Sequence, residues 1–192
     1  MIDGPFLVID VESVGLHGGD FAVAGGVYDR AGCKLKTLEE FCYAAPPSMA
    51  RGTAEDAAWV RENVPELMYT HESPYEVRNT FWDMWEHLKR KYPGILMLGE
   101  CIWPVEAKFL EQCIADLPNT RNWWGPYPLH EIASIMASAG MDPLAEYPRY
   151  ESEQPKHHPL CDVRQSARLL VTALNHLDYL HRSVAEDALE SA

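Results

Sequence analysis

Three stretches near the beginning of the chain carry the hydrophobic pattern of β-strands. Residues 6–13 open with the continuous apolar run Phe-Leu-Val-Ile, which is typical of a strand buried on both faces of a sheet. Residues 21–29 and 34–44 predict two further strands, which a turn over residues 29–32 connects. Because parallel pairing needs a long crossover, we expect these strands to form an antiparallel meander.

Helical patterns and one more strand follow the meander. Thr53 is a suitable cap for a short helix over residues 54–63. Ser73 and Glu76 form the pattern of a capping box at the start of a longer helix, which ends before Pro93. The remaining predicted elements are a buried strand over residues 95–99, helices over 104–116, 129–139 and 160–181, and loops over 118–128 and 141–155.

The order of these elements favours one α/β domain. The chain has 192 residues, the usual size of a single domain, and its 47% of hydrophobic residues is typical of globular proteins. We expect a mixed sheet flanked by helices, in which helical crossovers add parallel strands to the antiparallel meander. This domain should cover residues 1–182, and residues 183–192 are expected to be a frayed tail.

The chain is strongly acidic. Sixteen Lys and Arg residues against 29 Asp and Glu residues give a net charge of −13. This balance argues against a broad electrostatic contact with duplex DNA or with an anionic membrane. It is compatible with a small polyanionic substrate where bound cations neutralise a local acidic cluster.

The cysteine pattern and the N-terminus indicate an intracellular protein. The five cysteines are scattered and form no Cys-x-x-Cys pair, so neither a disulfide framework nor a structural zinc site is expected. The first residues lack the basic and apolar regions of a signal peptide, and no apolar run approaches the roughly 18 residues of a spanning helix. We therefore expect a cytoplasmic protein with no membrane partner, and a homodimer remains open as its assembly state.

Two carboxylates project from the first predicted strand. Asp10 and Glu12 are two residues apart, so their side chains leave the same face of the strand. Burying two like charges is costly without a compensating cation. Either the strand ends where both acids reach water, or the pair binds a divalent ion such as Mg²⁺ or Mn²⁺, which prefers oxygen ligands.

Two later segments offer further groups for such a site. Asp162 lies near the start of the last predicted helix, where it either caps the helix or serves as a third carboxylate ligand. His157 on the preceding loop is suited to act as a base, because the ordinary pKa of histidine lies near neutrality. Glu106 lies in the first turn of the helix after the fourth strand, where it either interacts with the helix dipole or completes an acidic cluster.

These residues make the sequence resemble the DEDDh 3′–5′ exonucleases, which belong to the ribonuclease H-like superfamily and include polymerase proofreading subunits and oligoribonuclease. Residues 10–16, Asp-Val-Glu-Ser-Val-Gly-Leu, resemble the first family motif, D-x-E-x-x-G-L. Residues 157–162 match the third motif, H-x-x-x-x-D. The resemblance extends over residues 5–175 and implies a ribonuclease H-like mixed sheet flanked by helices.

The resemblance also implies metal-dependent hydrolysis of phosphodiester bonds at single-stranded 3′ ends. Two Mg²⁺ or Mn²⁺ ions, about 4 Å apart, would flank the scissile phosphate, and His157 would accept the proton of the attacking water. The expected metal ligands are Asp10, Glu12, Glu106 and Asp162. The substrate would be the 3′ end of a single strand or a short oligonucleotide, with RNA slightly favoured over DNA.

Three residues within or beside these motifs are expected to bind the substrate. Gly15 and Leu16 end the first motif, so the resemblance implies that they contact the substrate. Trp103 lies directly beside the second motif, where an aromatic ring either stacks on a base or anchors the loop.

The second motif departs from the family pattern F-D-x-x-F-L. Residues 105–110 read Val-Glu-Ala-Lys-Phe-Leu, so Glu106 stands in place of the family aspartate. Glutamate keeps the charge but adds one methylene group, and its carboxylate must fold back or reach the ion through a water. The departure supports an alternative function, that of a catalytically weakened exonuclease-like protein that binds nucleic acid or a protein partner.

Overall fold

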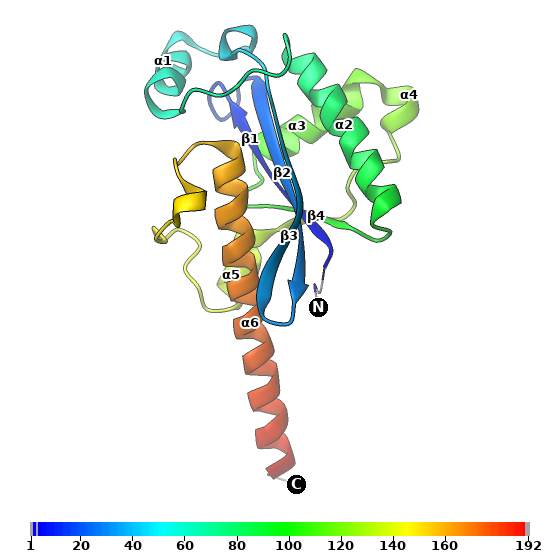
Figure 1. The fold of residues 1–192 in the computed structure, drawn as a ribbon, viewed down its shortest axis with the longest axis vertical. Helices are drawn as coiled ribbons and strands as arrows, with labels where there is room; N and C mark the ends of the chain where they lie inside the picture. The colour runs from blue at the N-terminus through cyan, green and yellow to red at the C-terminus, as the bar shows by residue number, and fades with distance from the viewer. Residues whose placement is uncertain (1, 3, 191–192) are drawn as a thin grey trace.

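A mixed sheet of five strands lies at the centre of the protein in this computed structural model, which describes residue 2 and residues 4–190 (Figure 1). The strands are β1 (Phe6–Ser13), β2 (Asp20–Ala31), β3 (Lys34–Ala44), β4 (Leu96–Gly99) and β5 (Leu129–Glu131). Their order across the sheet is β3-β2-β1-β4-β5, so β1 is the central strand. β1 and β2, and likewise β2 and β3, pair antiparallel, whereas β4 and β5 extend the sheet in parallel. The predicted meander and its parallel extension are therefore confirmed.

Helices cover both faces of this sheet (Figure 1). They are α1 (Ala54–Asn63), α2 (Pro74–Lys91), α3 (Val105–Asp116), α4 (Pro118–Arg121), α5 (Ile132–Ser138) and α6 (Pro159–Glu190), with short 3-10 turns at Pro47–Met49 and Glu151–Glu153. Thr53 caps α1, and Ser73 and Glu76 form the predicted capping box of α2. None of the described helices combines the length and the apolar character that a membrane crossing requires.

The alternation of side chains along β1 divides the core into two layers. Leu7 and Ile9 belong to the apolar cluster that packs against α2 and α3. Phe6 and Val8 point the opposite way, into the cluster that packs against α5 and α6. The same alternation directs the two acidic residues of β1 towards the face that α6 covers, so the local strand pattern already places them in one layer of the fold.

Three predicted elements differ from those observed. Residues 129–131 form β5 rather than the first turn of a helix, because their backbone pairs in parallel with β4. Residues 118–121 form α4 inside a predicted loop. Pro118 occupies its first turn, where backbone amides have no partner within the helix, so the proline costs no hydrogen bond. The last helix continues to Glu190 instead of ending near His181, in keeping with the helix-forming Ala, Leu and Glu residues of that segment. Much of the expected C-terminal tail is therefore helical.

Candidate active site

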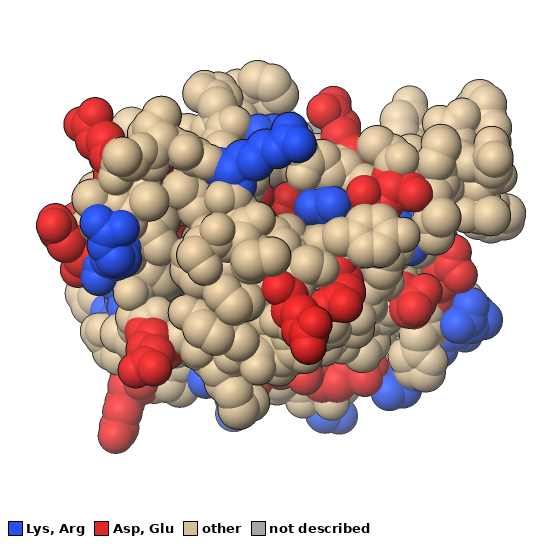
Figure 2. All heavy atoms as spheres, turned by 90° about the horizontal axis from the view of Figure 1, so that it is seen from above, with Lys and Arg blue, Asp and Glu red and all other residues tan. Residues whose placement is uncertain are grey.

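The end of β1 carries the predicted acidic pair. β4 ends at Gly99, which pairs with Ile9, so the last part of β1 extends beyond its parallel neighbour. Asp10 and Glu12 lie in this last part, at the carboxyl ends of the central strands, where α/β sheets commonly bind ligands. Figure 2 looks onto this end of the molecule, where acidic and basic side chains lie close together.

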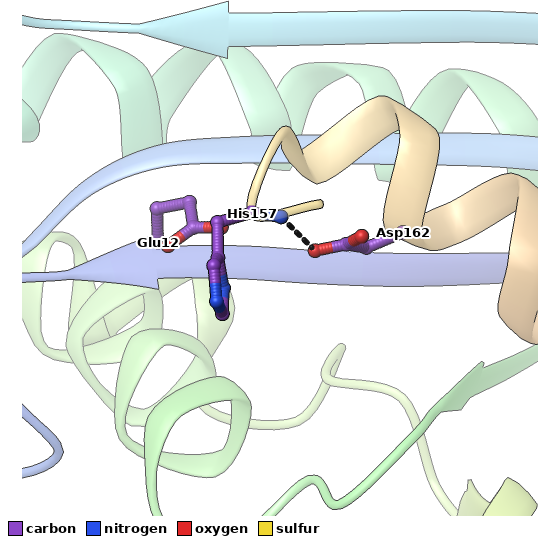
Figure 3. A group of neighbouring side chains, drawn as sticks. All are labelled: Glu12, His157 and Asp162. Carbon is purple, nitrogen blue, oxygen red and sulfur yellow. Dashed lines mark hydrogen bonds between the residues drawn. The ribbon is translucent and has the colours of Figure 1, made fainter. Parts of the chain in front are cut away.

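Asp162, in the first turn of α6, and His157, on the loop just before this helix, lie beside Glu12 (Figure 3). Each of these side chains has a potential ligand atom within 4.8 Å of those of the other two. The backbone amide of His157 donates a hydrogen bond of 3.1 Å to Oδ2 of Asp162. His157 has a left-handed backbone with a φ of 62°, which non-glycine residues adopt rarely and mostly where the surrounding structure holds them. The structure thus brings the first and third predicted motifs together, and places His157 rather than His158 in this group.

Glu106 reaches the same strand from α3. Its Oε1 accepts a hydrogen bond of 3.2 Å from the backbone amide of Val11, which lies between the two acids of β1. The carboxylate is close enough to Asp10 and Glu12 to raise the pKa of both. The Glu106 carboxylate therefore lies beside the acidic pair, and one of its oxygens accepts a bond from the backbone.

Glu100 is a further carboxylate of this site that lies outside the family motifs. It follows β4 directly, and its Oε2 accepts a hydrogen bond of 2.5 Å from the Ser166 hydroxyl on α6. Its charge contributes to the raised pKa of Asp10. Glu100 reaches the site because it directly follows β4, the parallel neighbour of β1.

Burial and mutual repulsion raise the pKa values of these carboxylates. The pKa of Glu12 rises to about 8, chiefly because burial removes its hydration and further because Asp162 and Glu106 lie nearby. Burial is also the main cause that raises the pKa of Glu106 to about 7. The pKa of Asp10 lies well above its ordinary value, first through burial and then through its acidic neighbours. Without a bound cation, the cluster therefore retains protons near neutral pH.

This donor set fits a divalent ion. Carboxylate oxygens are the ligands that Mg²⁺ and Mn²⁺ prefer, and a bound cation would relieve the repulsion that raises the pKa values of the cluster. The carboxylates that could hold such ions are those of Asp10, Glu12, Glu106 and Asp162. Burial lowers the pKa of His157, with Lys156 and Arg149 acting in the same direction and Asp162 opposing them, so its imidazole is biased towards the neutral form.

A pocket of about 360 Å³ opens beside the carboxylates, and its lining includes Glu12, Gly15, Leu16, Trp59 and His157. The Trp59 ring meets the His157 ring edge-on, with 5.2 Å between the ring centroids. Leu16 is 67% exposed and Trp59 47% exposed, so two apolar side chains face solvent at this pocket. Trp59 was not identified from the sequence, because its contact with His157 depends on how α1 packs and not on any local motif.

Of the two other predicted substrate residues, Gly15 lines this pocket and Trp103 lies outside it. Gly15 has a φ of 81°, and a Cβ atom there would lie 2.5 Å from Cγ of Asp56, so glycine is required at this position of the pocket wall. Trp103 is 74% exposed and is not among the described residues that line the pocket. Its stacking on a base stays a prediction.

A second pocket of about 740 Å³ adjoins the first, and the two share Leu16 and Asp56. Its lining includes the cationic side chains of Arg51 and Lys108. Nζ of Lys108 donates hydrogen bonds to the carbonyl oxygens of His17, at 2.5 Å, and Gly18, at 2.6 Å. Lys108 therefore holds the loop after β1 while it places a positive charge next to the acidic site.

Comparisons with known proteins identify the fold. No protein-family model and no curated protein matches the sequence. Among solved structures, the zinc-bound and metal-free forms of the E. coli ExoI–ssDNA complex resemble the chain with TM-scores of 0.57 and 0.54, each at 14% identity over 92% of this chain and 42% of that one. Cell-death related nuclease 4 (CRN-4) resembles it with a TM-score of 0.50, at 16% identity over 89% of this chain and 64% of that one. This chain thus spans less than half of ExoI and just under two thirds of CRN-4.

The likeness to these nucleases and the strand order establish a ribonuclease H-like α/β fold, as the motif resemblance implied.

Proposed function

We propose that the chain is a metal-dependent exonuclease of the DEDDh type that removes nucleotides from the 3′ ends of single strands. The observation that carries this proposal is the convergence of Glu12, His157 and Asp162 within 4.8 Å, with Asp10 and Glu106 beside them. All of these residues stand at positions that the family motifs assign. The shared fold of ExoI and CRN-4 supports the assignment, and the single-stranded DNA in the ExoI complex supports a single-stranded substrate.

The carboxylates and the histidine would divide the chemistry between them. Asp10, Glu12, Glu106 and Asp162 would hold the ions, and bound Mg²⁺ or Mn²⁺ supplies positive charge at the scissile phosphate and lowers the pKa of the attacking water. His157 would accept the proton of that water. Because burial lowers the pKa of His157, its imidazole is available as a proton acceptor near neutral pH.

The two adjoining pockets suit the end of a single strand. The smaller one, of about 360 Å³, falls within the size range of small-ligand sites. Leu16 and Trp59 offer apolar surface to a terminal base, and stacking contributes roughly 1 to 3 kcal/mol per base. Arg51 and Lys108 in the larger pocket would contact the next phosphate along the strand. A substrate bound mainly at its 3′ end can be short, and the preference for RNA over DNA stays a prediction.

Digestion of short labelled oligonucleotides tests the proposed function. With Mg²⁺ or Mn²⁺, a 5′-labelled single strand should shorten from its 3′ end one nucleotide at a time, and EDTA should stop the reaction. A matched strand with a blocked 3′ end should remain intact, and parallel RNA and DNA series measure the sugar preference. Internal cleavage products would contradict exonucleolytic digestion, and early release of the labelled 5′ nucleotide would contradict its direction. Intact substrate at all metal concentrations would contradict the activity itself.

A catalytically weakened protein that binds nucleic acid is the second candidate. It is favoured by the bond between Glu106 and the Val11 amide, since this bond uses part of the carboxylate that stands in place of the family aspartate. Tight binding of single strands without hydrolysis in Mg²⁺ or Mn²⁺ would select this candidate over the first.

A further inference from the structure

Arg149, on the loop before α6, reaches into the carboxylate cluster. Its Nη1 atom donates a hydrogen bond of 2.5 Å to Oδ1 of Asp162 and one of 2.9 Å to the backbone carbonyl of Glu153. Both side chains of the ion pair are largely buried, with 15% of Arg149 and 16% of Asp162 exposed. Since Oδ2 of Asp162 accepts the His157 amide, each oxygen of this carboxylate already has a partner.

The loop that carries Arg149 is attached firmly to α6. The Glu153 carboxylate, which is buried, accepts hydrogen bonds of 2.6 and 2.8 Å from Arg168 and one of 3.0 Å from the Tyr150 amide. The guanidinium of Arg168 also lies over the Tyr150 ring, 4.3 Å from its centroid. Arg168 further donates a hydrogen bond of 2.9 Å to the Pro148 carbonyl. These bonds hold the backbone on both sides of Arg149 and keep its guanidinium at the cluster.

Arg149 is therefore a fixed positive charge close to the buried carboxylates of Asp10 and Glu12, whose pKa values are raised. Among the residues that the structure describes, it is the cation that forms an ion pair with the carboxylate cluster, through Asp162. A divalent ion bound by Asp162 would face this charge at close range, in a largely buried setting where solvent screens repulsion poorly. The same carboxylate cannot serve both cations fully, because Arg149 occupies one of its oxygens.

We propose that Arg149 is a tethered counter-ion that competes with a divalent metal ion for Asp162. This inference rests on the proposed function only in taking the cluster as the metal site. In the metal-free protein, the Arg149–Asp162 pair compensates part of the buried negative charge. Metal binding then has to weaken or break this pair, so the arginine sets the metal concentration at which the site fills.

Calorimetric titration of the full chain with Mn²⁺ alone, without nucleic acid, tests the competition. Arg149→Gln should bind Mn²⁺ about ten-fold more tightly than the wild type, a factor equal to about 1.4 kcal/mol. Arg149→Lys keeps the charge and should stay within about three-fold of the wild type. Arg164→Gln is the matched control, since Arg164 lies on α6 near Asp162 and donates a hydrogen bond to the Ser152 carbonyl of the same loop, but forms its ion pair with Glu40. Arg164→Gln should also keep the Mn²⁺ affinity within about three-fold of the wild type.

Thermal unfolding gives the second readout. The metal-free Arg149→Gln protein should unfold at a lower temperature than the wild type, because Asp162 loses its partner, and Mn²⁺ should raise its midpoint by more. The inference would be overturned if Arg149→Gln bound Mn²⁺ no more tightly than the wild type, or if none of the proteins bound Mn²⁺. The same gain in Mn²⁺ affinity in Arg164→Gln or Arg149→Lys would also overturn it. Tighter Mn²⁺ binding without strand hydrolysis would refute the proposed function and leave the competition standing.

Discussion

Replacing Glu12 by glutamine should stabilise the metal-free protein, and increasingly so as the pH rises. The pKa of Glu12 is raised from 4.5 to about 8, chiefly by burial. A carboxyl group with a higher pKa in the folded state holds its proton more tightly there than in the unfolded chain. The contribution of protonated Glu12 to the unfolding free energy is therefore fully present below about pH 4.5. It is lost as the pH rises through the interval up to about 8. Glutamine keeps the shape of the side chain without this penalty.

The size of the effect follows from the width of that interval. One pKa unit corresponds to about 1.4 kcal/mol, so the interval between the ordinary pKa of Glu12 and about pH 7 gives an upper limit on the order of 3 kcal/mol. Asp10 and Glu106 share the buried protons with Glu12, because these groups titrate together. A single substitution should therefore recover about 1 to 2 kcal/mol near pH 7.

Urea unfolding in the presence of EDTA, at several pH values between about 5 and 8, measures this effect. The difference in unfolding free energy between Glu12→Gln and the wild type should grow with pH, from near zero at about pH 5 to about 1 to 2 kcal/mol near pH 7. Glu111→Gln, at an exposed position of α3, is the matched control and should show a small difference that does not change with pH. A difference for Glu12→Gln that stays constant, or that shrinks as the pH rises, would refute the reasoning.

Further predictions concern catalysis and substrate binding. His157→Ala should lower turnover by about 10² or more while Mn²⁺ binding persists, whereas His158→Ala should leave turnover near that of the wild type. Glu106→Gln should weaken metal binding and slow hydrolysis, and Glu106→Asp should retain or increase the rate; equal rates and metal affinities for the wild type and Glu106→Gln would contradict this. Arg51→Gln should raise KM with little change in kcat and reduce the slope of log binding constant against log salt by about 1. Trp59→Ala should raise KM for single strands, and an unchanged KM would exclude stacking on this ring.

Local sequence patterns predicted the central part of the fold. The apolar run of β1, the short turns after it and the capping box at Ser73 are signals that act over a few residues, and the structure contains the elements that they predicted. The alternation of side chains also placed Asp10 and Glu12 on one face of a strand. β5 could not be predicted in this way, since its three residues are extended only because they pair with β4.

In the candidate site, too, residues that belong to a sequence motif could be predicted, whereas residues placed by tertiary packing could not. His157 and Asp162 could be paired with β1 through a motif, although they lie far away in the sequence. Trp59 and Arg149 have no such signal, because their positions depend on the packing of α1 and on the attachment of a loop to α6. The bond from Val11 to Glu106 likewise exists only because β4 ends before β1 does.

The most direct test of the central claim compares hydrolysis by the wild type and by Asp10→Asn. The substitution removes the charge of the central carboxylate while nearly preserving its shape, and unfolding curves recorded in EDTA verify that both proteins are folded. With Mn²⁺ and a 5′-labelled single strand, the wild type should produce a ladder of products shortened from the 3′ end, and Asp10→Asn should leave the strand intact over the same time. A ladder formed at the same rate by Asp10→Asn would contradict the assignment of this cluster as the catalytic metal site.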